Sequence, residues 1–77
     1  IEPHAQIILT KLKEEGGFLP YHDKTSPEII YSTFHLSKKA FKKAVGNLFK
    51  NQLIRLDEEG MHLVPEIVQE ETERSQE

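Results

Sequence analysis

The sequence predicts an α+β fold of the winged helix-turn-helix type, with three helices plus a small antiparallel sheet that carries a hairpin wing. Three observations predict it. Apolar residues recur at helical spacing in three segments, only a short break separates the second segment from the third, and two short alternating stretches follow. We expect this domain to span residues 1–64, and residues 65–77 to form an acidic, disordered tail with too few apolar residues to fold alone.

The first predicted helix covers residues 4–15 and is stopped by the two glycines that follow it. Its apolar positions are Ala5, Ile7, Ile8 and Leu12. Residues 17–20, GFLP, form a short apolar stretch that a proline ends, which is typical of an edge strand. We expect this segment to be the third strand of the sheet.

The second predicted helix has two possible capping arrangements at its start. Either Thr25 caps it with Glu28 reaching back, or Ser26 caps it with Pro27 as the first helical residue. The apolar residues that it carries are Ile29, Ile30 and Phe34. A break at residues 35–37 then separates it from the third helix, and two helices joined by so short a turn form a helix-turn-helix unit.

The third predicted helix is capped by Ser37 and runs to about residue 52, and its side chains fall into two arcs. The apolar arc, which faces the core, contains Ala40, Phe41, Ala44, Val45 and Leu48. The opposite arc contains Lys38, Lys39, Lys42, Lys43, Gly46 and Lys50. Residues 53–56 and 61–64 alternate in polarity, and the segment DEEG between them predicts the turn of a β-hairpin wing.

Charge is segregated along the chain, so the net charge of −3 hides a basic segment. Residues 65–77 carry five acidic residues against one arginine. Residues 29–56 contain no acidic residue, yet they hold six of the ten lysines and arginines. This distribution indicates a surface suited to an anionic partner.

The lysines of the third helix oppose its stability. Lys38 with Lys42, and Lys39 with Lys43, are like charges one helical turn apart, and each pair costs about 0.2–0.5 kcal/mol. The helix dipole also favours acids rather than lysines in the first turn. A phosphate docked at this end of the helix would reverse both effects, because it would meet free backbone N–H groups, the Ser37 hydroxyl and two ammonium groups. The candidate nucleic-acid-binding residues are Ser37, Lys38, Lys39, Lys42, Lys43, Lys50 and Arg55.

The lysine arc is also compatible with three roles that involve no nucleic acid. It is a solvated face, or it binds the acidic tail, or it binds another part of a longer protein. Gly46 costs a helix about 1 kcal/mol relative to alanine, and it lets either a foreign backbone or a neighbouring helix approach closely.

The expected binding is weak, salt-sensitive and poorly specific. The third helix has no arginine and few side chains suited to base edges, so its lysines would position a nucleic-acid backbone rather than distinguish sequences. We expect the aromatic residues of the chain mostly in the core, with Tyr21 the most exposed of them.

The sequence carries no catalytic or metal-binding signature. It has no cysteine, and its four histidines share no ligand spacing, so we expect isolated surface histidines and no metal site. It has no glycine-rich phosphate loop, no nucleophile elbow and no apolar run that would span a membrane. We therefore expect a non-catalytic, cytoplasmic protein without a cofactor, a membrane partner or a small-molecule substrate.

Residues 16–64 resemble the C-terminal winged-helix domain of the conserved virulence factor B family of bacterial RNA-binding proteins. The segments that carry the resemblance are GGFLPYHDKTSPE, FHLSKKAFKKAVGNLFK, and the LI and GMHL of the hairpin. The resemblance implies N-terminal OB-fold barrels that bind RNA, in a cytoplasmic regulator of virulence-gene expression. Since this chain begins at Ile1 rather than Met, we expect it to be a piece of such a protein. The family supplies no catalytic or contact residues to transfer.

Two functions from different classes are consistent with this resemblance. The chain is an accessory nucleic-acid-binding module, with RNA favoured over DNA by the resemblance, or it is an interdomain or protein docking module that positions the N-terminal barrels. The first requires that the lysine arc bind nucleic acid, and the second that it dock an acidic protein surface.

Overall fold

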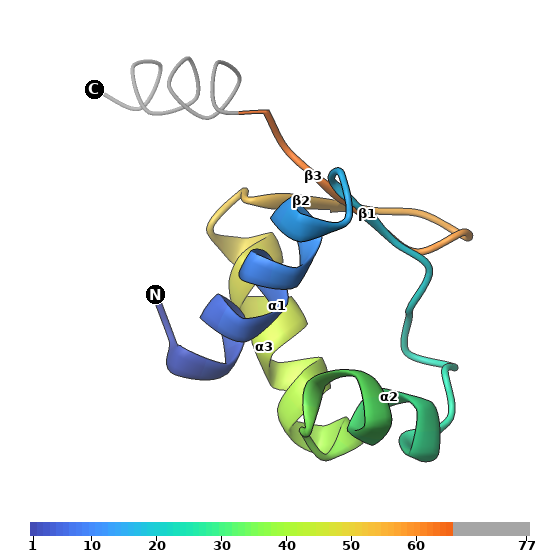
Figure 1. The fold of residues 1–77 in the computed structure, drawn as a ribbon. Coiled ribbons are helices and arrows are strands. Elements are labelled where there is room, and N and C mark those ends of the chain that lie inside the picture. Colours follow the sequence, from blue (N-terminus) through green and yellow to red (C-terminus); the bar gives the residue numbers. More distant parts are fainter. Residues whose placement is uncertain (66–77) are drawn as a thin grey trace.

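Six elements follow one another along residues 1–65, which are the residues that this computed structural model describes (Figure 1). They are α1 (Pro3–Glu14), β1 (Phe18–Leu19), α2 (Pro27–Phe34), α3 (Lys38–Lys50), β2 (Ile54–Leu56) and β3 (Met61–Leu63). This order confirms the predicted α+β winged helix-turn-helix fold. The predicted acidic tail lies outside the described residues except for Pro65, so that expectation stays a prediction.

The start of α2 decides between the two capping arrangements that the sequence allowed. Ser26 is the cap, since its Oγ accepts a hydrogen bond from the backbone N–H of Ile29 at 3.4 Å. Pro27 follows as the first helical residue, where its missing N–H is not needed. The Thr25 hydroxyl instead accepts a bond from the N–H of His22 at 2.9 Å and so closes the preceding loop.

The helix ends follow the local backbone chemistry. Beyond α1, Gly16 and Gly17 adopt φ values of 80° and 96°, and the Gly17 N–H donates to the Leu12 carbonyl at 2.7 Å, as in a glycine C-cap. Helix α3 ends at Lys50, two residues before the predicted end, because Gln52 turns into the left-handed region with φ of 61°.

The three strands form one antiparallel sheet in the order β1-β3-β2, as predicted for a wing with an added third strand. The β2–β3 hairpin is the wing, and in its register Arg55 lies opposite His62. Its turn ends at Gly60, which must be glycine. A β-carbon there would overlap the Leu19 carbonyl oxygen of β1, so the close packing of the wing on β1 depends on this position.

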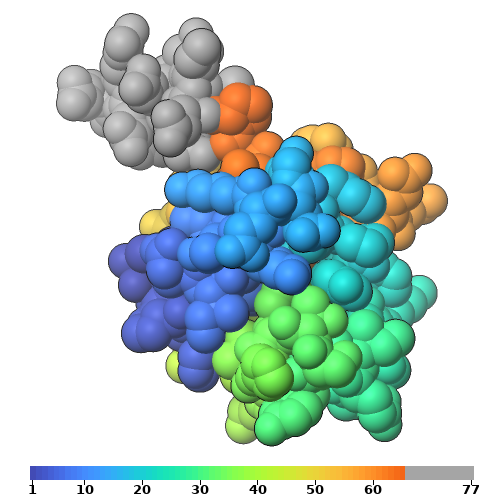
Figure 2. All heavy atoms as spheres, viewed as in Figure 1, coloured from blue at the N-terminus to red at the C-terminus, as the bar shows by residue number. Residues whose placement is uncertain are grey.

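The core lies where the three helices and the inner face of the sheet meet. Its buried residues are Ala5, Ile8, Leu9, Leu12, Leu19, Ile30, Phe34, Leu36, Phe41, Ala44, Leu48, Ile54 and Met61. The apolar arc of α3 is confirmed, with Ala40 and Val45 partly buried at its edge. Ile7 and Ile29, by contrast, are exposed, and Leu9, which was not among the expected apolar positions of the first helix, is buried. In the view of Figure 2, α1 and α2 fill the front of the molecule and little of α3 is visible.

Candidate nucleic-acid interface

Ser37 caps the N-terminus of α3, as the sequence predicts. Ser37 has extended backbone angles, and its Oγ accepts a hydrogen bond from the N–H of Ala40 at 3.1 Å. The preceding turn can be short because His35 adopts a left-handed conformation with φ of 59°. The hydroxyl oxygen is therefore already engaged as a cap, and the first turn of α3 contains no acidic residue.

The lysine face comprises Lys38, Lys39, Lys42, Lys43 and Lys50 of α3. All are exposed except Lys38, which is partly buried. Within residues 1–65, ion pairs join carboxylates only to His4, Arg55 and His62, so no lysine of this face is neutralised by a described carboxylate. On the opposite side of the helix Phe41, Ala44 and Leu48 are anchored in the core, which fixes the direction in which the lysines point. The result is a positively charged surface carried by an anchored helix.

Gly46 lies in the middle of this face, and no part of residues 1–65 packs against it. A β-carbon added at this position would have no heavy atom within 4 Å outside its immediate helical surroundings. The idea that Gly46 allows α1 or α2 to pack closely is therefore wrong. Since the backbone here is exposed, Gly46 leaves open space on the surface of α3.

A groove of about 370 Å³ opens between α3 and the wing, directly beside the lysine face. Phe41 and Met61 line it as fully buried residues, and Leu56 stands on its wing side with 44% of its surface exposed. Its other lining residues are Tyr21, His22, Asp23, Lys42, Val45, Gly46, Asp57 and Gly60. The sequence did not indicate this groove, because it depends on how the hairpin packs against the helix.

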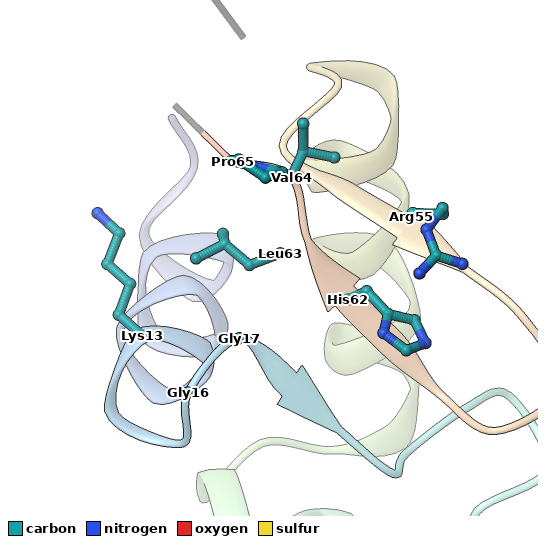
Figure 3. Close-up of a pocket in the computed structure, with 8 residues that line it drawn as sticks. All are labelled: Lys13, Gly16, Gly17, Arg55, His62, Leu63, Val64 and Pro65. Carbon is teal, nitrogen blue, oxygen red and sulfur yellow. The ribbon is translucent and has the colours of Figure 1, made fainter. Parts of the chain in front are cut away.

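Arg55 belongs to β2 of the wing, whereas the lysines of the face belong to α3. Its guanidinium group is within 3.3 Å of the Asp57 carboxylate, as an exposed ion pair with a hydrogen bond. Arg55 lines a second hollow together with Lys13 and His62. Figure 3 shows Arg55 and His62 on the same side of the wing, whereas the ammonium group of Lys13 points away from both. Arg55 and Lys42 therefore line different hollows, and their joint role in one binding surface stays a prediction.

His62 is not the isolated surface histidine that the sequence suggested. Its Nε2 lies 2.7 Å from Asp57 Oδ2, and its ring contacts Phe18 of β1 with centroids 4.9 Å apart. Register in the sheet explains this, because His62 pairs with Phe18 on one side and Arg55 on the other. The contacts of His62 with Asp57 and Phe18 therefore join the wing to its own turn and to β1 through side chains, in addition to the backbone pairing of the strands.

The Asp57 carboxylate holds the turn of the wing together through hydrogen bonds. Its Oδ1 accepts hydrogen bonds from the N–H groups of Glu59 at 3.0 Å and Gly60 at 3.2 Å. Desolvation opposes ionisation and raises the pKa of Asp57, but these two hydrogen bonds and the neighbouring His62 together lower that pKa below the usual 3.8. The carboxylate is therefore committed to the turn and is a poor candidate for a ligand contact.

The exposed aromatic residues differ from the prediction. Tyr21 is partly buried and packs edge-on against Phe34, with ring centroids 5.5 Å apart. Tyr31 and Phe49 are exposed instead, at 61% and 56%. Phe49 follows Gly46 by three residues on α3, so the two share one side of the helix and an aromatic ring lies at the end of the lysine face.

The exposed lysines of α3, which pair with no carboxylate of residues 1–65, suit the binding of an anion. Among residues 1–65 no group of three or more histidine, aspartate or glutamate side chains is arranged to hold a metal ion. In the same region no helix is both long and apolar enough to cross a membrane.

Comparison with known proteins relates this arrangement to a family. Residues 6–63 match the family of CvfB-like winged helix domains. Conserved virulence factor B of Staphylococcus aureus (strain MRSA252) is 40% identical over 57 residues, and the match covers 74% of this chain and 19% of that protein. The protein of the same name from Staphylococcus haemolyticus (strain JCSC1435) shows the same identity and coverage. The match thus spans about a fifth of the length of these relatives.

A solved structure supports the same relationship. The crystal structure of a multidomain protein with nucleic acid binding domains, from Streptococcus pneumoniae, superposes on this chain with a TM-score of 0.80 at 47% identity. The match covers 83% of this chain and 22% of the other.

Proposed function

Since the chain belongs to the family of CvfB-like winged helix domains, we propose that it is a non-catalytic nucleic-acid-binding module that contacts the phosphate backbone through the lysine face of α3. The observation that carries the proposal is the set of five lysines on one helix, none of them paired with a carboxylate of residues 1–65. Their like-charge repulsion destabilises the free helix and would be relieved by phosphates.

The proposed ligand is RNA rather than DNA, and the proposed setting is a regulator of virulence-gene expression in the bacterial cytoplasm. The names of the staphylococcal relatives and the nucleic acid binding domains of the pneumococcal neighbour support this setting. In it the lysine face would extend an RNA-binding surface that N-terminal OB-fold domains begin. The absence of arginine from α3 supports contacts with the backbone over bidentate contacts with bases.

A second function is favoured by a hollow between α1 and α2. Ile7 and His35 border a hollow between α1 and α2, and the exposed ring of Tyr31 contacts His35 with centroids 5.8 Å apart. Exposed apolar side chains around a hollow suit a neighbouring domain of the longer protein. In this alternative the chain is a docking module, and adding the domains that precede it would shift the amide resonances of α1 and α2.

The test of the main proposal is fluorescence anisotropy with a labelled single-stranded RNA and a labelled duplex DNA. The test variant is the triple reversal Lys39→Glu, Lys43→Glu and Lys50→Glu, which should abolish binding. The matched control is the triple reversal Lys11→Glu, Lys13→Glu and Lys24→Glu, which changes the net charge equally but leaves the lysine face intact. We expect the control to retain most of the affinity.

Equal losses in the two variants would show that net charge alone governs binding. Failure of the unaltered chain to bind either nucleic acid would overturn the proposal and favour the docking function. The stronger of the two ligands identifies the nucleic acid.

A further inference from the structure

We propose that the groove between α3 and the wing receives one unstacked base of a single-stranded nucleic acid whose phosphates lie on the lysine face. This inference rests on the proposed function and adds a subsite to it. A duplex keeps its bases stacked and paired, so the groove selects a single strand or an unpaired loop.

The dimensions and lining of the groove suit a base. Its volume of about 370 Å³ falls within the range of about 300–1,000 Å³ that is typical of small-ligand pockets. Phe41 and Met61 form its buried floor, whereas Val45 is partly exposed and Leu56 remains 44% exposed on the wing side. Leaving so much apolar surface in water is unfavourable, and a flat aromatic base would cover it.

The charges around the groove favour one orientation of the strand. Lys42 lines the groove from α3 and belongs to the lysine face, whereas Asp23 and Asp57 line it from the loop and the wing. Asp57 is already paired with Arg55, but the Asp23 carboxylate repels phosphates and Lys42 attracts them, so the backbone lies over α3 and the base points toward the wing. His22 adds a donor on that side, because its Nδ1 already accepts from the Lys24 N–H at 3.1 Å and its proton is therefore on Nε2.

Gly46 gives the strand access to the groove. It lies between Lys42 and Phe49 on the same side of α3, where a side chain would stand between the phosphates and the groove. No packing contact in residues 1–65 requires glycine there. Close approach of a ligand accounts for its presence, and the exposed Phe49 ring beside it offers a surface for the next base.

The experiment compares two labelled RNAs of the same length by anisotropy at low salt. One strand is intact and the other has abasic residues at its internal positions, so the phosphates are equal and only the bases differ. We expect the 77-residue chain to bind the intact strand about tenfold more tightly, which is the lower part of the range for contact with a base.

The variant Gly46→Leu should reduce this ratio severalfold, leaving only the contribution of Phe49, without weakening binding of the abasic strand. Leucine is a good helix former, and its β-carbon would meet no heavy atom within 4 Å outside the neighbouring turns of α3, so we expect the variant to remain folded. Phe49→Ala, at an exposed position, should lower the ratio in part. The control Ser32→Leu adds the same side chain on the exposed surface of α2 and should leave the ratio unchanged.

The outcomes separate this inference from the proposed function. Salt-dependent binding of both strands with equal affinity would overturn the base subsite and leave phosphate docking intact. An unchanged ratio in Gly46→Leu would also overturn it. Absence of binding to either strand would overturn both proposals together.

Discussion

Gly46→Ala should stabilise the protein, although it alters the middle of the candidate binding surface. In an exposed helix interior, glycine costs about 1 kcal/mol relative to alanine because more backbone freedom is lost on folding. The added methyl group would meet no heavy atom within 4 Å beyond its own helical surroundings, so no clash offsets the gain. For a domain of this size, about 1 kcal/mol corresponds to a rise in Tm of roughly 4–8 °C.

Thermal unfolding followed by circular dichroism measures this change, and Gly60→Ala provides a matched control. The same substitution at Gly60 would place its β-carbon against the Leu19 carbonyl oxygen at a backbone φ of 150°, so it should lower the Tm strongly. An unchanged or lower Tm for Gly46→Ala would refute the reasoning, since it would mean that position 46 has a structural role. A rise would show that this site retains glycine at the expense of stability.

Three further predictions concern the cap, the wing and the tail. Ser37→Ala should lower the free energy of unfolding by about 1 kcal/mol in urea titrations, because α3 loses its cap. Ser37→Asp should keep the cap but weaken RNA binding. A Ser37→Ala variant as stable as the unaltered chain would contradict the assigned cap. Because folding lowers the pKa of Asp57, its charge stabilises the protein fully above the unfolded pKa of about 4, and this contribution is lost as the pH falls through the lower folded value. The stability advantage over Asp57→Asn should thus be present at neutral pH and shrink below about pH 4, and a difference independent of pH would count against the assigned contacts. Deletion of residues 65–77 should strengthen RNA binding at low salt if the acidic tail competes for the lysine face, and an unchanged affinity would exclude that competition.

Local signals in the sequence were sufficient for the fold. The cap at Ser37, the glycines after α1 and the DEEG turn each act within a few residues, so their effects are visible without knowledge of the tertiary structure. The helical period of α3 likewise separates the lysine arc from the core, as the buried positions of Phe41 and Leu48 confirm.

The features that the sequence did not reveal depend on contacts between distant segments. The His62 and Asp57 contact requires the hairpin register, and the groove requires the wing to pack beside α3. The exposure of Phe49 was missed for a related reason. Hydrophobicity suggested a core position, but Leu48 and Ala44 already fill the inner side of the helix at that level.

The most direct test of the central claim is the salt dependence of binding between the 77-residue chain and a single-stranded RNA. If four phosphates are neutralised by the lysine face, the logarithm of the association constant should fall against the logarithm of salt concentration with a slope of about −3. The Lys39, Lys43 and Lys50 reversal should flatten this dependence. A slope near zero for the unaltered chain would contradict phosphate docking on α3.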